Sequence, residues 1–322
     1  MKYQARELRV VETDRQVCLV RYSPCGKWLL TGGYDAAIRR YDLTGEEPAP
    51  REPLTGHHGW LQSFAFLPDG KTLLSVDSWG QLCAWPFAEE QPQPLWKHEQ
   101  AHDGWIRALA VSADGKLAAT VGRDCMVRVW NTVDGTRLHE FAGHQHDVYS
   151  VAIHPDGRSV VSADLLGNLK HWSLTENKLS REVQLTAMHF YDRIQDVAGL
   201  RILQFRDADT LVCAGSDPTR AGRSFGIPTI RLLDWKSLKA TRELPVGEDK
   251  DGFIFDLHPR EEGRFLLVTS GPPGAGKLLL KFSVPDSCSR VAAAAAECVC
   301  VGRRGICRKI LQRAAQTQRT RQ

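Results

Sequence analysis

The sequence of 322 residues lacks a long apolar run, since none approaches the roughly 18 to 20 residues that a membrane-spanning helix needs. Its first residues, MKYQARELRVVETDRQV, lack the apolar core of a secretory signal peptide. It also lacks a C-x-x-C pair, and its nine cysteines are an odd number without regular spacing. These absences argue against a disulfide framework and a zinc site. We therefore expect a cytoplasmic protein with no membrane partner, no metal and no other cofactor.

Basic charge is scarce in most of the chain, although the formal net charge is +4. The segment 286–322 holds eight of the 42 basic residues and only two of the 38 acidic ones. Residues 1–285 are left with 34 basic and 36 acidic residues, a net charge of −2. This balance predicts no nucleic-acid partner, because nucleic-acid binding usually needs a basic surface.

What the sequence does contain is an internal repeat. Three segments align without gaps for most of their length, and they begin GHHGWLQSFAFLPDG at Gly56, AHDGWIRALAVSADG at Ala101 and GHQHDVYSVAIHPDG at Gly143. A fourth copy, VCLVRYSPCGKWLLTGGYDAAIRRYDL, precedes them, and looser copies occupy 201–235 and 253–284. Each copy reads as strand, turn, strand, turn, strand, with a fourth strand before the next copy, as in RLHEF at 137–141. Four short strands at a period of about 40 to 45 residues fit one propeller blade per repeat.

At this point the chain resembles the WD-repeat (WD40) β-propeller family, in a form of bacterial type. The residues that carry the resemblance are the blade histidines His57, His102 and His144, the turns Asp69-Gly70, Asp114-Gly115 and Asp156-Gly157, and the strand-ending aromatics Tyr41, Trp85, Trp130, Trp172 and Phe282. The resemblance covers roughly residues 5 to 285 and is strongest from 17 to 174. It implies an all-β fold with six recognisable four-stranded blades.

The chain divides into a predicted propeller, 1–285, and a basic tail rich in Ala, Arg and Cys, 286–322. The stretch Arg6–Val10 aligns with RLHEF, so we expect it to be the outer strand that closes the last blade. The tail has no P-D-G turn and no Trp. One hypothesis makes it the aberrant or out-of-frame last blade of a seven-bladed parent; the alternative is a helical or disordered tail on a six-bladed ring.

The segment Gly271–Lys277, GPPGAGK, has the G-x-x-x-x-G-K spacing of a phosphate-binding loop. The residue after the lysine is Leu278, not the Ser or Thr that would hold Mg²⁺, and LLLKFSVP suits a strand better than a helix. We therefore interpret GPPGAGK as a turn between two strands of the sixth blade, and nucleotide binding as the less favoured alternative.

Histidine, hydroxyl, acid and tryptophan residues recur at fixed spacing and invite comparison with a catalytic triad. The family resemblance implies instead a buried network that ties turns to strands. The predicted structural network is His57, Ser75, Trp85, His102, Thr120, Asp124, Trp130, His144, Ser162 and Trp172. The acid position holds Trp79 in one copy and Leu166 in another, so we expect those two networks to be incomplete. No catalytic residue is predicted.

Propellers that this chain resembles bind peptides or protein surfaces on the face where the central channel opens. The residues that match such positions are Tyr34, Trp60, Gln62, Trp105, Arg107, Arg123, Asp147, Tyr149, Arg201 and Phe253. Trp, Tyr and Arg are the residue types that carry most binding energy at interfaces. The alternative is that Trp60 and Trp105 pack between blades.

The sequence thus predicts a monomeric, non-enzymatic scaffold that binds a protein or peptide through an aromatic and arginine-rich face. The alternatives are a small-molecule binder or enzyme that uses the central channel and, less favoured, a nucleotide binder at Gly271–Lys277. The scaffold interpretation depends partly on analogy with the family.

Overall fold

The structure is a computed structural model that describes residues 6–13, 16–185, 189–192, 195–217, 227–246, 253–259, 265–270, 278–283, 297–301 and 306–311. These residues form strands and turns and contain no α-helix. Within them there is accordingly no helix of the length and apolarity needed to cross a membrane. The predicted all-β class is confirmed.

Five antiparallel sheets have four strands each, and every sheet is built from four strands that are consecutive in the chain. The first sheet contains β2 (Val17–Tyr22), β3 (Trp28–Gly33), β4 (Ala37–Asp42) and β5 (Ala49–Thr55). The second contains β6 (Leu61–Phe66), β7 (Thr72–Asp77), β8 (Leu82–Pro86) and β9 (Trp96–His98). The third contains β10 (Ile106–Val111), β11 (Leu117–Gly122), β12 (Val127–Asn131) and β13 (Arg137–Phe141).

The fourth and fifth sheets follow the same pattern. The fourth contains β14 (Val148–Ile153), β15 (Ser159–Asp164), β16 (Asn168–Ser173) and β17 (Lys178–Gln184). The fifth contains β20 (Leu200–Asp207), β21 (Thr210–Asp217), β22 (Ile227–Asp234) and β23 (Ala240–Pro245). A hairpin of β18 (His189–Asp192) and β19 (Gln195–Ala198) lies between them in the sequence.

The sixth copy contributes β24 (Phe253–Pro259), β25 (Phe265–Ser270) and β26 (Leu278–Ser283). It therefore has three strands in the described part of the chain, one fewer than the four predicted for each copy. The segment Gly271–Lys277 lies outside the described residues. Ser270 pairs with Leu278 across antiparallel strands, and the segment is followed by strand β26. The predicted strand after GPPGAGK is confirmed, and the helix that a phosphate-binding loop requires is not present there.

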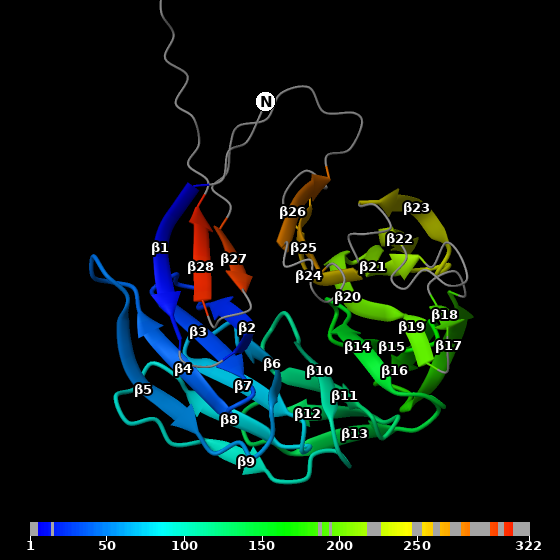
Figure 1. The fold of residues 1–322 in the computed structure, drawn as a ribbon. Helices are drawn as coiled ribbons and strands as arrows, with labels where there is room; N and C mark the ends of the chain where they lie inside the picture. The colour runs from blue at the N-terminus through cyan, green and yellow to red at the C-terminus, as the bar shows by residue number, and fades with distance from the viewer. Residues whose placement is uncertain are drawn as a thin grey trace, which may run out of the picture.

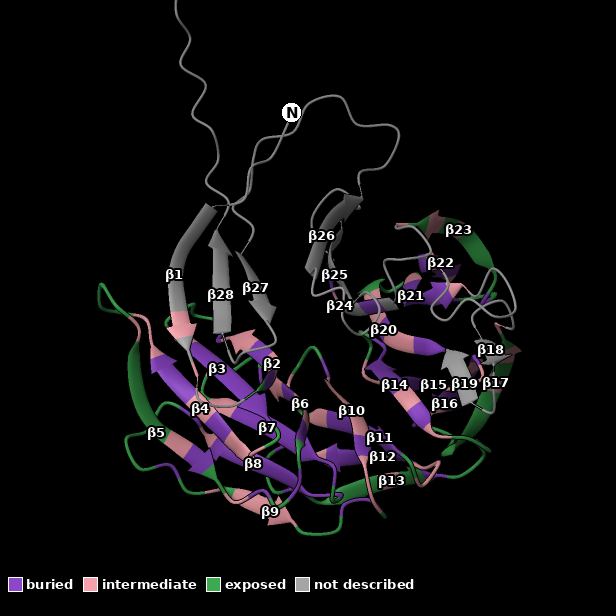
Figure 2. Cartoon of the chain, viewed as in Figure 1, coloured by how far each residue is buried: buried purple, intermediate pink, exposed green. Residues whose placement is uncertain are grey.

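The sheets stand side by side around a common centre, as the blades of a propeller do (Figure 1). The apolar core lies between neighbouring sheets: Leu30 and Ile38 of the first pack with Leu61 and Phe64 of the second. Figure 2 shows that the middle strands of the five four-stranded sheets are mostly buried and that the outer strands β5, β13, β17 and β23 are mostly exposed. Because each sheet buries its face against the next sheet, removal of apolar surface from water favours the ring as a whole.

A separate three-stranded sheet joins the two ends of the chain. Strand β1 (Arg6–Glu12) pairs with β28 (Ile306–Leu311), which pairs with β27 (Glu297–Val301). The prediction of a helical or disordered tail is therefore wrong for the two tail strands. The sequences ECVCV and ICRKIL contain Val and Ile, which favour strands, and the edge of β1 offers unpaired backbone groups. The Ala- and Arg-rich composition of the whole tail concealed these two short segments.

An ion pair connects the first and sixth copies. Arg21 of β2 donates to Asp256 of β24 over 2.6 Å (to Oδ2) and 3.3 Å (to Oδ1). Burial acts to raise the pKa of Asp256, but the Arg21 charge, the neighbouring His258 and the Leu257 backbone N–H together hold this pKa well below its ordinary value of 3.8. The two ends of the repeat array are thus joined by a contact between residues 235 positions apart.

Candidate functional site

The three best copies contain the same hydrogen-bonded group of side chains. The His Nε2 to hydroxyl oxygen distances are 2.6 Å for His57 and Ser75, 2.8 Å for His102 and Thr120, and 2.7 Å for His144 and Ser162. In each copy the strand-ending Trp donates its Nε1–H to the same hydroxyl over 2.8 Å, from Trp85, Trp130 and Trp172. The structure therefore brings together every residue of the predicted network.

The acid of the network differs from the prediction in two copies. His102 Nδ1 lies 2.9 Å from Asp124 as predicted, whereas His57 Nδ1 lies 3.1 Å from Asp77 and His144 Nδ1 lies 3.2 Å from Asp164. The expectation of incomplete networks was wrong, because in these copies the acid comes from the end of the strand and not from the turn after it. The repeated Ser-x-Asp of the two strands, SVD and SAD, was the available signal.

These groups are sealed from water, as Ser75, Thr120 and Ser162 are completely buried. Burial acts to raise the pKa of Asp77, but hydrogen bonds from His57, Gln81 and Gly59 lower it to about 2. Burial also lowers the pKa of His102 despite the neighbouring Asp124. A neutral histidine that donates to the acid and accepts from the hydroxyl satisfies each group. The arrangement is that of a structural network, because no substrate can reach the hydroxyl.

The side chains of the described residues do not indicate a metal site. No three His, Cys, Asp or Glu side chains of the described residues are grouped closely enough to hold a metal ion. His98, four residues before His102, lies 2.7 Å (Nε2) from the Gly135 carbonyl oxygen.

Six of the predicted partner-binding residues form a continuous run, which we call the aromatic–arginine arc: Tyr34, Trp60, Trp105, Arg107, Tyr149 and Arg201. The Trp60 ring meets Tyr34 at 4.8 Å and Trp105 at 5.7 Å between centroids, both edge to face. The Arg107 guanidinium lies 4.5 Å from the Trp105 ring centroid and 4.8 Å from that of Tyr149. Arg201 reaches the same Tyr149 ring at 5.5 Å. The arc thus crosses the first five sheets of the propeller.

A repeated backbone irregularity explains how the arc is displayed. The first strand of every copy has a register shift near its start, at the second residue in the first five copies (positions 18, 62, 107, 149 and 201) and at the third residue, 255, in the sixth. A β-bulge leaves one residue unpaired and re-aims its side chain. Arg107, Tyr149 and Arg201 of the arc are such bulged residues. The same position in the sixth copy is 255, two residues after the predicted Phe253, whose side chain lies outside the described ones.

The remaining predicted residues surround the arc. Gln62 is half-buried and donates weakly to the Trp60 carbonyl oxygen at 3.5 Å. Asp147 forms an ion pair with Arg107 at 3.0 Å. The exposed Arg123 lies beside Trp105, since its backbone N–H donates to the Trp105 carbonyl oxygen over 2.9 Å.

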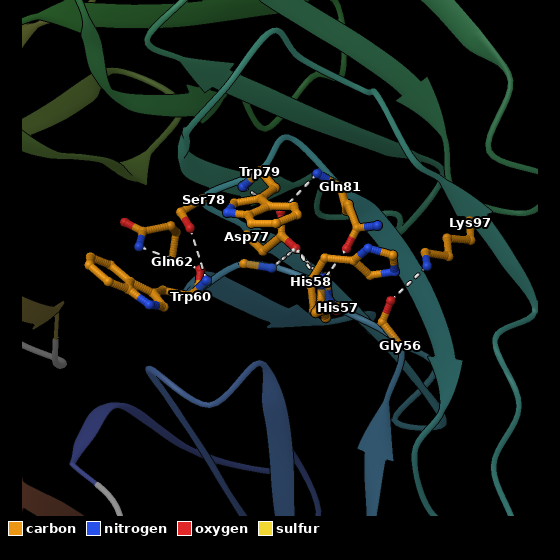
Figure 3. Close-up of polar contacts among 12 residues, drawn as sticks. Gly56, His57, His58, Trp60, Gln62, Asp77, Ser78, Trp79, Gln81 and Lys97 are labelled. Atoms are coloured by element: carbon orange, nitrogen blue, oxygen red, sulfur yellow. Dashed lines mark hydrogen bonds and ion pairs between the residues drawn. The ribbon is translucent and has the colours of Figure 1, made fainter.

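Exposure of the arc is greatest at its aromatic end, where Tyr34 is 47% and Trp60 44% exposed. Figure 3 shows Trp60 and Trp79 on either side of Ser78, whose hydroxyl accepts from the Trp60 backbone N–H over 2.9 Å. Trp79 is 65% exposed and was missed as a surface residue, because the sequence alignment gave it the acid position. Three large aromatic side chains are therefore accessible on one side of the first two sheets.

Comparison with known proteins agrees with the repeats. The family model described as "WD domain, G-beta repeat" matches residues 7–42, 49–85, 93–131 and 135–173. The chain is also similar to "Protein groucho" of Drosophila melanogaster, with 24% identity over 191 residues that make up 58% of this chain. The matched part is 26% of the length of that relative, so the chain spans about a quarter of it.

Proposed function

Because this chain belongs to the WD-repeat family, we propose that it is a non-enzymatic scaffold that binds a protein or peptide through the aromatic–arginine arc. The observation that carries the proposal is the contact series from Tyr34 to Arg201, which crosses five sheets and includes two aromatic side chains that are almost half exposed. Exposed aromatics beside arginines are typical of the residues that dominate binding energy.

The rigidity of the arc supports this proposal. The rings of Tyr34, Trp60 and Trp105 are held edge to face, and Arg107 is held between two rings and by Asp147. Side chains that are already ordered lose little conformational entropy when a partner binds, so more of the contact energy remains as affinity. The hydroxyl groups that contact a histidine in the three networks, those of Ser75, Thr120 and Ser162, are buried, which supports a binding role over an enzymatic one.

A capture experiment tests the proposal. The full chain and a variant with Trp60→Ala, Trp105→Ala and Arg107→Ala are immobilised, and proteins retained from a lysate of the native host are compared by quantitative mass spectrometry. We expect at least one specific partner to be lost by the variant, with a fall in retention of about tenfold or more, because hot-spot residues cost about 2 kcal/mol or more each when truncated.

The matched control is a variant with Leu95→Ala, Val133→Ala and Leu138→Ala, which removes exposed apolar side chains elsewhere on the surface. Thermal unfolding verifies that both variants fold. Partners retained equally by the arc variant and the wild-type chain, at equal folded fraction, would reject the arc as the binding surface.

A further inference from the structure

The two ends of the aromatic–arginine arc differ in chemistry. At one end Tyr34 and Trp60 present exposed ring surface, and the adjacent Asp35 is paired with Arg39. At the other end two guanidinium groups, of Arg107 and Arg201, approach the single ring of Tyr149. The arc therefore has an apolar end and a cationic end.

A basic ligand group does not suit the cationic end. A cation is attracted to the face of an aromatic ring, but Arg107 already lies over Trp105 and Tyr149 at 4.5 and 4.8 Å. The edge-to-face contacts of Trp60 with Tyr34 and Trp105 also bring these rings together, which leaves no cage between them for a ligand cation.

An anionic group would relieve repulsion at this end. Burial lowers the pKa of the Arg201 guanidinium, and the nearby charge of Arg107 lowers it further. Asp147 accepts a hydrogen bond from one terminal nitrogen of Arg107. A guanidinium has further N–H donors, so Arg107 can also bind a carboxylate of the partner through a second nitrogen. The exposed Arg123, beside Trp105, adds a third guanidinium on this face.

We propose that the arc selects an acidic segment of a partner protein, in which an apolar or aromatic side chain rests against Tyr34 and Trp60 and a carboxylate a few residues away pairs with Arg107 and Arg201. This inference rests on the proposed function. The contacts along the arc are 4.5 to 5.7 Å each, so a single side chain cannot cover them, whereas an extended chain advances about 3.3 Å per residue and needs several residues to do so.

The test measures fluorescence anisotropy of three labelled decapeptide pools with the full chain. One pool combines a fixed Phe with Asp residues after it, the second has Lys in place of Asp, and the third has Ala in place of Phe. We expect the first pool to bind about tenfold more tightly than the second at low salt, with a difference that shrinks as salt rises. Equal or tighter binding of the Lys pool, or no binding of the Asp pool, would overturn the inference.

Variants separate this inference from the proposed function. Arg107→Gln and Arg123→Gln, at an exposed position, should each weaken binding of the Asp pool about fivefold or more, whereas Arg137→Gln on the outer strand β13 should not. If the arginine variants bind like the control while Trp60→Ala weakens binding, only the acidic preference fails. If Trp60→Ala and Trp105→Ala also bind like wild type, the arc itself is not the site. Melting temperatures verify the fold of each variant.

Discussion

At the residue scale, the histidine networks show why a catalytic motif and a structural one can share the same residue types. In the three copies that contain a network, one hydroxyl accepts a hydrogen bond from a Trp N–H and contacts a histidine, which in turn contacts a carboxylate. Triad catalysis requires a hydroxyl that substrate can reach. Here the hydroxyl is completely buried. The same residue types therefore satisfy one another's hydrogen bonds in the core, where an unpaired polar group would cost free energy.

Thr120→Val tests the structural role of this network. The substitution preserves the shape of the side chain but removes the hydroxyl that Trp130 and His102 share. We expect the free energy of unfolding to fall by about 1 to 3 kcal/mol, because two buried polar groups lose a partner. Urea unfolding followed by tryptophan fluorescence measures the change, and a loss of less than about 0.5 kcal/mol would contradict the assigned role.

The buried His171 should make the free energy of unfolding depend on pH. Its Nδ1 accepts from Arg181 Nε over 3.1 Å and its Nε2 contacts Ser159 at 3.0 Å, so the ring is neutral when folded. Burial, the charge of Arg181 and that of His154 lower its pKa from 6.5 to about 4, although Asp156 opposes them. The unfolded chain therefore binds the proton more readily, and stability should fall as pH decreases from 6.5 to 4.

The loss attributable to His171 should be on the order of 3 kcal/mol at the acid end of this range. Melting temperatures of the wild-type chain and His171→Gln are compared from pH 7 to 4. The variant should have a shallower decline, since it lacks this titrating group. Parallel curves for the two proteins would show that His171 does not contribute.

At the scale of the elements, the blades are joined through glycines in the turns between their second and third strands. Gly80 has a φ of +89°, and its carbonyl oxygen accepts from the backbone N–H of Ala101 in the connection to the third sheet. A Cβ at this position would lie 2.1 Å from the His102 carbonyl oxygen. Close approach of two backbones, and not turn geometry alone, requires glycine here.

Gly80→Ala and Gly70→Ala form a matched pair that separates the two effects. Gly70 also has a positive φ, +66°, but a Cβ there would meet nothing within 4 Å. We expect Gly70→Ala to cost about 1 to 2 kcal/mol from backbone strain alone. Gly80→Ala should cost about 1 to 3 kcal/mol more because it also forces two sheets apart. Equal losses in chemical denaturation would contradict an interlocking role for Gly80.

At the scale of the whole molecule, a ring of sheets must join its beginning to its end. The described residues do so twice, through the pairing of β1 with β28 and through the Arg21 and Asp256 ion pair. Because the core lies between neighbouring sheets, an open ring would expose the apolar faces at both ends. Contacts that close the ring should therefore affect the stability of the entire array.

Arg21→Gln tests the closing contact. We expect it to lower the free energy of unfolding by about 1.5 to 3 kcal/mol, since Asp256 would lose two charge-assisted hydrogen bonds. The control is Arg51→Gln, which breaks an ion pair with Asp42 within the first sheet and should cost no more than about 1 kcal/mol, because Arg51 is half exposed. Equal effects of the two variants would show that closure does not depend on this pair.

The sequence alone determined the repeat, the strands of the copies and the residue types of the arc. Strand alternation and turn chemistry are local properties of the sequence, and the same pattern recurs in six copies. It did not determine that Asp77 and Asp164 complete two networks, that the bulge of the sixth copy falls at 255, or that ECVCV and ICRKIL join β1 in a sheet. These features depend on which segments distant in the chain become neighbours. Only the closed tertiary structure decides such pairings, since the free energy of a buried contact exists only once both partners are in place.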